Sequence, residues 1–146
     1  MDPTLASLLD EREIINVQIR YGMSLDARDW DAFRTCFAKD AVAVYEGLGE
    51  FAGVDAIEEL CKRALLPLTR SQHLLGNHCV QVDGDSATAQ CYYQAQHLLV
   101  GTEGGDTYVI AGKYADDFVR TADGWRLQTR TLEIWWTDGN PAVIAA

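Results

Sequence analysis

The sequence predicts an α+β domain in which helices come first and a mostly antiparallel sheet follows. Apolar residues at helical spacing dominate the chain before Pro67, and the spacing becomes typical of strands after it. Four strand-like runs then follow, at about residues 70–82, 86–102, 107–120 and 125–136. The separators between these runs, DGD, EGGD and TADG, are typical of hairpin turns. Helices followed by such a meander favour helices that cover one face of a sheet, in one domain over residues 1–146.

Three helices are predicted before Pro67. Asp2-Pro3 is typical of a helix start, and this first helix should end near Asp26 to Arg28. Its buried face is predicted to hold Leu5, Leu8, Leu9, Ile15, Ile19 and Met23. A short second helix, capped by Asp29, should turn Trp30 and two phenylalanines inward. The strands AVAVYEG and GEF are expected before a third helix over residues 54–66.

Period-two alternation distributes the three histidines over the predicted strands. In the 86–102 run, Tyr93 and His97 share a small, apolar face that should point at the helices. In the 70–82 run, alternation places His73 and Cys79 on one face and His78 on the other. Only one of these two histidines can then face the helices, and His78 is expected to be a packing residue.

Composition and charge exclude several classes of function. The net charge of −10 and the lack of a basic patch disfavour nucleic acid and anionic membranes as partners. The N-terminus is acidic where a signal peptide is basic, and no apolar run approaches the roughly 20 residues of a membrane helix, so a cytoplasmic protein is expected. The four cysteines form no C-x-x-C pair, which predicts buried, reduced thiols and no metal site.

One long segment of the sequence is similar to a known family. The stretch RYGMSLDARDWDAFRTCFAKDAVAVYEG, followed by SQHLLGN, resembles the SnoaL-like and scytalone-dehydratase-like branch of the nuclear-transport-factor-2-like superfamily. The shared marks are a helix with Tyr-x-x-x-x-Asp, a DW pair in the second helix, a strand ending in tyrosine and a later QH strand. The resemblance runs from about residue 8 to 136. It implies a cone-shaped α+β barrel, in which a strongly curved sheet and the helices enclose a deep apolar pocket.

The resemblance also implies a set of catalytic residues. Several members of this branch are lyases that need no cofactor and act through an Asp–His dyad. The matching residues here are Asp26 and His73, and the pocket tyrosines of the family fall on Tyr21 and Tyr45. The fungal dehydratase has a tyrosine directly before its aspartate, where this chain has Leu25. Tyr21 instead fits the pattern of the bile-acid dehydratase relatives.

Four further residues are expected to bind the substrate. His97 matches a second histidine of the fungal dehydratase, and Arg130 matches an arginine on the last strand of a related dehydrochlorinase. Arg130 has an alternative role, an ion pair with an acid such as Glu133. Trp30 and Tyr93 complete the expected substrate-binding set.

The expected activity is a dehydration of an apolar cyclic or aromatic hydroxy-carbonyl compound, without cofactor or metal. His73 would take the proton next to the carbonyl, Asp26 would orient the imidazole, and the two tyrosines would donate to the carbonyl oxygen. A polyketide cyclase or ketosteroid-type isomerase, with a carboxylate base, is the first alternative. A non-catalytic binding module or an oxygenase small subunit is the second. A homo-oligomer, dimer or trimer, is expected, with Trp135 or Trp136 in its contact or at the pocket mouth.

Overall fold

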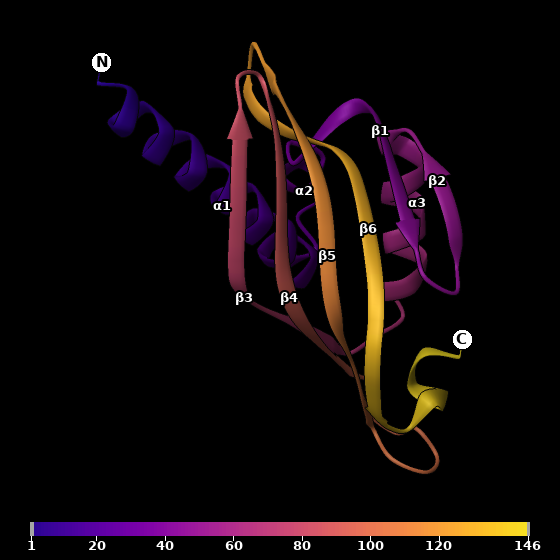
Figure 1. Cartoon of the computed structure of the whole chain (residues 1–146). Helices are drawn as coiled ribbons and strands as arrows, with labels where there is room; N and C mark the ends of the chain where they lie inside the picture. The colour runs from indigo at the N-terminus through magenta and orange to yellow at the C-terminus, as the bar shows by residue number, and fades with distance from the viewer. Residues whose placement is uncertain (1, 146) are drawn as a thin grey trace.

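A computed structural model describes residues 2–145 and has the predicted order of elements (Figure 1). The elements before the hairpins are α1 (Pro3–Ala27), α2 (Trp30–Arg34), β1 (Phe37–Tyr45), β2 (Gly49–Ala52) and α3 (Val54–Leu65). The long strands are β3 (Arg70–Asp83), β4 (Ser86–Leu98), β5 (Thr107–Thr121) and β6 (Gly124–Gly139), and a short 3₁₀ helix, η1 (Pro141–Ile144), follows them. The last strand extends three residues beyond the predicted end at 136, and β4 ends four residues before the predicted 102.

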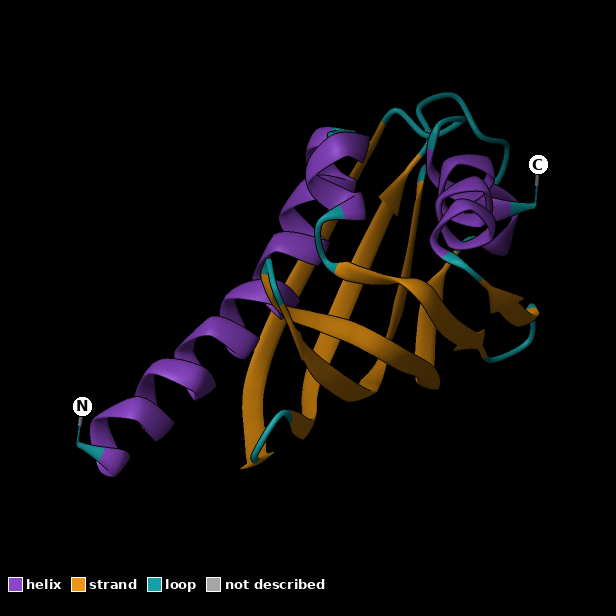
Figure 2. Cartoon of the chain, turned by 90° about the horizontal axis from the view of Figure 1, so that it is seen from above, coloured by secondary structure: helices purple, strands orange, loops and turns teal. Residues whose placement is uncertain are grey.

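The six strands form one mixed sheet in the order β2-β1-β6-β5-β4-β3. Neighbouring strands are antiparallel except for β1 and β6, which run parallel. Within residues 2–145 the sheet is open, with β2 and β3 at its edges, and it curves around the helices that cover its inner face (Figure 2). This is the cone-shaped architecture that the family resemblance implies, although the sheet does not close into a barrel, and the hollow of the cone contains the cavity described below.

The buried face of α1 differs from the predicted one. The structure buries Ile14, Val17, Tyr21 and Leu25, whereas the predicted Leu5, Leu8, Leu9 and Met23 are about half exposed or more. The first turns of α1 project beyond the sheet, so the leucines there have no surface to pack against (Figures 1 and 2). Further along, Gly22 faces β3: a Cβ at this position would lie 2.9 Å from Leu75 Cδ1 and 3.4 Å from His73 Cβ. This close approach brings the end of α1 against β3.

A β-bulge in β3 overturns the predicted alternation. Gly76 pairs with Tyr92 but Cys79 pairs with Gln90, so Asn77 and His78 together face one residue of β4. Asn77 has a φ of 53°, a left-handed conformation that asparagine tolerates better than most residues and that one type of bulge uses. The inserted residue inverts the alternation that follows, so His78 lies on the inner face with His73 and Cys79 is exposed. The other three cysteines are buried thiols, as predicted.

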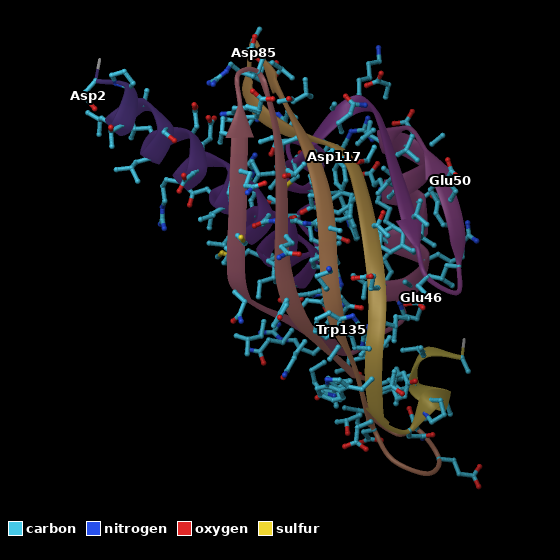
Figure 3. The ribbon with its side chains drawn as sticks, in the orientation of Figure 1. Asp2, Glu46, Glu50, Asp85, Asp117 and Trp135 are labelled. Atoms are coloured by element: carbon cyan, nitrogen blue, oxygen red, sulfur yellow. The ribbon has the colours of Figure 1, made fainter. Side chains whose placement is uncertain are left out.

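The outer face of the sheet carries exposed aromatic side chains. Trp135 is 52% and Trp136 47% exposed near the end of β6, and Trp135 packs edge-on against Tyr92 of β4 at 5.0 Å between ring centroids. Figure 3 shows Trp135 on the sheet, low in this view. Over residues 2–145 the helices include none with the length and apolar character that a bilayer crossing requires.

Candidate active site

The end of α1 and the start of β3 hold Asp26 and His73 in a direct hydrogen bond. His73 Nδ1 lies 2.7 Å from Asp26 Oδ1, and the backbone N–H of His73 donates to Asp26 Oδ2 at 2.7 Å. A carboxylate can only accept here, so the proton between the two side chains sits on His73 Nδ1. In the neutral imidazole, Nε2 then carries a lone pair. The predicted pairing of Asp26 with His73 is therefore present as a geometric contact.

Two residues behind Asp26 fix the direction of its hydrogen bonds. Arg28 Nη1 donates to Ser71 Oγ at 2.8 Å, and Ser71 Oγ donates to Asp26 Oδ1 at 3.0 Å. Since an arginine only donates, Ser71 must use its single proton for the carboxylate. Burial raises the pKa of Asp26, but the hydrogen bonds from His73 and Ser71 outweigh it, so the pKa lies below its ordinary value. Asp26 is thus an ionised acceptor whose two oxygens are both occupied.

A cavity of about 400 Å³ lies between α1, α3 and the inner face of the sheet. Its lining is mainly apolar, from Leu25, Leu60, Leu65, Ala95, Ile110, Leu132 and Ile134. The exposed lining residues, Glu46 to Leu48, Arg63, Ala64 and Ile144, place the mouth between the β1–β2 turn, the end of α3 and η1. Figure 3 shows Glu46 at the end of β1, on the side of the C-terminal turn. His73 reaches the cavity with a side chain only 6% exposed.

His97 lines the same cavity from β4, the strand next to β3 in the sheet. Its Nδ1 lies 3.1 Å from the carbonyl oxygen of Tyr108, an acceptor, so Nδ1 carries the proton of the neutral ring. Burial lowers the pKa of His97, and the nearby His73 adds to this, so the neutral form is favoured. His97 therefore offers a second imidazole lone pair to the cavity.

Four tyrosines line the cavity, including the predicted Tyr21, Tyr45 and Tyr93. The hydroxyl groups of Tyr21 and Tyr45 lie 2.8 Å apart, and Tyr45 also contacts Cys61 Sγ at 3.7 Å. Tyr93 donates its hydroxyl proton to the carbonyl of Glu133 at 2.8 Å. Burial raises the pKa of Tyr21 and of Tyr45 well above the ordinary value, so both remain protonated donors. Tyr114, which sequence reasoning missed, is the fourth.

Arg130 and Trp30 lie outside the lining of this cavity. Arg130 is fully buried and donates from Nε and Nη2 to the two carboxylate oxygens of Asp116, both at 2.8 Å. Its predicted partner Glu133 instead pairs with Lys113 on the neighbouring strand. The guanidinium lies over Tyr21 at 4.2 Å, so Arg130 touches the cavity wall from behind. Trp30 is partly buried against the core, where it packs edge-on against Phe33 and beneath Lys62 of α3.

His78 belongs to a buried hydrogen-bond chain rather than to the cavity lining. Its Nδ1 lies 2.8 Å from Gln18 Oε1, and Gln18 Nε2 donates to Asp116 Oδ2 at 3.0 Å. This chain links β3, α1 and β5 beneath the sheet. The predicted packing role of His78 stays a prediction, but the contact to Gln18 gives it a specific partner.

The buried His97 and the half-buried His78 predict that the protein loses stability in weak acid. Burial lowers the pKa of each below 6.5, so the unfolded chain binds protons more strongly than the folded protein. The free energy of unfolding should be nearly constant between about pH 7 and 8 and fall as the pH drops below about 6.5. Urea denaturation at a series of pH values measures this. His97→Asn and His78→Gln should each flatten the slope, and a flat profile in the wild-type protein would contradict the assignment.

Among residues 2–145, no group of three or more His, Cys, Asp or Glu side chains is arranged to hold a metal ion. The polar side chains of the cavity are two imidazoles, four phenols and the Cys61 thiol, with the charged Glu46 and Arg63 at its mouth. They can accept and donate protons within an apolar space, which suits acid–base chemistry on a carbon acid.

Comparison with known proteins settles the family. The model of the SnoaL-like domain matches residues 6–131. The chain belongs to the SnoaL-like domain family. Among curated proteins, this SnoaL-like domain is 32% identical to the uncharacterized protein Rv2910c of Mycobacterium tuberculosis over 129 residues, which are 87% of this chain and 86% of that protein.

Several solved structures share the fold of this SnoaL-like domain. The protein Kfla4162 of Kribbella flavida superposes with a TM-score of 0.88 and 26% identity, over 96% of this chain and 99% of that one. A protein of Novosphingobium aromaticivorans, provisionally named a scytalone dehydratase, gives 0.85 and 20% identity over 94% and 91%. The hexachlorocyclohexane dehydrochlorinase LinA-type3 of Novosphingobium barchaimii gives 0.78 and 18% identity over 94% and 92%. At these last two identities the likeness shows the fold.

Proposed function

We propose that this protein is a cofactor-independent lyase that removes water from an apolar cyclic or aromatic hydroxy-carbonyl compound. The observation that carries the proposal is the His73 imidazole, whose Nδ1–H is held by Asp26 while the ring reaches an apolar cavity. A buried imidazole with one nitrogen committed and the other free is suited to act as a general base near neutral pH.

The geometry favours His73 over a carboxylate as the base. Both oxygens of Asp26 already accept hydrogen bonds, and Asp26 lies behind His73 as seen from the cavity. Glu46, the carboxylate in the lining, sits at the mouth and accepts from the backbone N–H of Ile134. A cyclase or isomerase with a carboxylate base is therefore less well supported than an Asp–His lyase.

The proposed reaction balances without an external oxidant or reductant. His73 Nε2 takes the proton from the carbon next to the carbonyl, and the electron pair moves onto the carbonyl oxygen. A hydroxyl proton from the Tyr21–Tyr45 pair stabilises that oxygen. The electrons then return to form the carbon–carbon double bond as the β-hydroxyl leaves. The imidazolium of His73 gives its proton to the departing oxygen, which leaves as water.

Two structural neighbours support an elimination. One carries a dehydratase name and the other is a dehydrochlorinase, and both names describe loss of a small leaving group. A neutral base and an apolar cavity suit either leaving group, but His73 as an imidazolium can protonate a departing hydroxyl. This supports water as the leaving group here.

Exchange of carbon-bound hydrogen in heavy water tests the proposed function. The wild-type protein and the His73→Gln variant are incubated with aromatic and steroid-like hydroxy ketones, and NMR follows deuterium entry next to the carbonyl and loss of water. We expect both changes with the wild-type protein only. Exchange that survives in the variant would assign the proton transfer to another group and overturn the role of His73.

Ser71 is expected to support this reaction without touching the substrate. Ser71→Ala removes one donor to Asp26 and one of the three acceptors of Arg28, which keeps the carbonyls of Leu25 and Leu65, so Asp26 is held less firmly against His73. We expect the turnover number to fall by about ten- to a hundredfold, the range for a lost hydrogen bond to a charged group. Ser71→Thr keeps the hydroxyl and should retain most of the activity. Equal activity of Ser71→Ala and wild type would exclude this role.

A further inference from the structure

Tyr114 on β5 has a hydroxyl that no other group of the protein uses. The residue is 1% exposed and lines the cavity, and its hydroxyl hydrogen-bonds to no protein group among residues 2–145. The other cavity tyrosines differ, because Tyr21 and Tyr45 share a hydrogen bond and Tyr93 donates to a backbone carbonyl. A hydroxyl that faces a cavity without a partner in the protein is suited to bind a ligand.

The ring of Tyr114 is held on three sides. It stacks on Tyr93 with centroids 4.5 Å apart and planes 22° apart, and it meets Tyr21 edge-on at 5.5 Å. The guanidinium of Arg130 lies 4.0 Å from its centroid. The hydroxyl oxygen is therefore fixed before any ligand binds, and only its proton can rotate. A donor that is preorganised in an apolar site stabilises developing negative charge without the cost of reorienting solvent.

The charge of Arg130 lies close to the phenol of Tyr114. Asp116 binds its Nε and Nη2, while Nη1 has no partner among the described residues. Burial raises the pKa of Tyr114 well above its ordinary value, and the charge of Arg130 opposes this only in part. The phenol therefore stays protonated near neutral pH, and the nearby cation makes it a stronger hydrogen-bond donor than an isolated buried phenol.

We propose that Tyr114 is a catalytic residue, a further donor that joins the Tyr21–Tyr45 pair in binding the oxygen on which negative charge develops. This rests on the proposed function and deepens it, because the substrate must then present a carbonyl oxygen to β5 while its acidic carbon faces His73 on β3. The site should accordingly bind aromatic hydroxyl compounds in their ionised form, with the phenolate oxygen in the place of the enolate oxygen and the released proton on His73.

Binding of 4-nitrophenol tests this assignment without a known substrate. The ligand absorbs visible light only when ionised, so titration at a pH below its own pKa reports both binding and proton loss. With the wild-type protein we expect the bound phenolate. Tyr114→Phe should weaken phenolate binding by about ten- to a hundredfold, the range for a lost hydrogen bond to a charged group. The neutral analogue 4-nitroanisole should bind both proteins equally, which shows that the cavity is intact.

Tyr92→Phe provides the matched control. It removes a phenol hydroxyl from the neighbouring position of β4, where the ring is exposed on the outer face and packs against Trp135, so phenolate binding should change less than about threefold. Equal phenolate affinity of Tyr114→Phe and wild type would overturn the proposal, as would a wild-type protein that binds only the neutral phenol. Phenolate binding that persists in His73→Gln would instead count against His73 as the base and leave Tyr114 as the donor.

Discussion

The variant Asp26→Asn is expected to lower turnover by about 10⁴-fold while the protein stays folded, the loss seen when a histidine's orienting aspartate becomes an amide. In the native site both Asp26 oxygens accept hydrogen bonds from His73 and Ser71. An amide replaces one acceptor by a donor, so His73 can no longer hold its proton on Nδ1 against it. The proton of the neutral ring then lies on Nε2, so Nε2 can no longer accept a proton from the substrate.

Steady-state kinetics with a compound identified by the exchange experiment measures this effect. Asp31→Asn makes the same chemical change on the exposed side of α2 and should leave turnover within about twofold of wild type. Circular dichroism of both variants checks the fold. An Asp26→Asn protein with wild-type turnover would remove Asp26 from the mechanism.

The second large effect concerns stability. Asp116→Asn is expected to lower the free energy of unfolding by about 3–5 kcal/mol, because it leaves the charge of Arg130 buried without a counter-ion. The side chains of both residues are completely inaccessible to solvent. Urea denaturation measures the change. Asp117→Asn, one residue along on the outer face, should change stability by about 1 kcal/mol or less.

A double variant separates the ion pair from simple packing. Asp116→Asn combined with Arg130→Met removes both charges, so much of the lost stability should return, as it does when buried ion pairs are replaced by apolar groups. If the double variant is less stable than Asp116→Asn alone, Arg130 contributes mainly through its packing against Tyr21 and Tyr114. The buried charge would then not explain the effect.

Much of the fold was predictable because the elements are long and carry local signals. Asp2 and Asp29 are helix caps that can be recognised from sequence, and Gly84 and Gly124 lie in hairpin turns with positive φ. The buried face of α1 was not predictable, because its first turns run past the sheet and their apolar residues imitate a core face. Only the packed position of Gly22 against β3 decides which side is buried.

In the candidate site, too, some residues could be predicted from the sequence and others could not. Asp26 and His73 could be paired from the family resemblance, and alternation correctly placed His97 on the inner face. His78 and Cys79 were misplaced because one inserted residue in a strand reverses every side chain after it. The Gly76-Asn77 pair inside the strand was the available sign of a bulge.

Other site residues act through contacts that no local pattern reveals. Ser71 reaches Asp26 across 45 positions of the chain, and Arg130 finds Asp116 on the neighbouring strand. Tyr114 has the inner-face position that alternation allows for many aromatic core residues. Only its lack of a hydrogen-bond partner in the described structure distinguishes it, and that requires the packed neighbours Tyr21, Tyr93 and Arg130 to be in place.

The most direct test of the account is the tautomer of His73, read from ¹⁵N chemical shifts and one-bond couplings in uniformly labelled protein at neutral pH. The hydrogen bonds of Asp26 require neutral His73 to carry its proton on Nδ1, with an unprotonated Nε2 toward the cavity. Asp26→Asn should reverse this assignment, whereas Asp31→Asn should leave it unchanged. A wild-type His73 with its proton on Nε2 would leave the cavity without its proposed base and would contradict the mechanism.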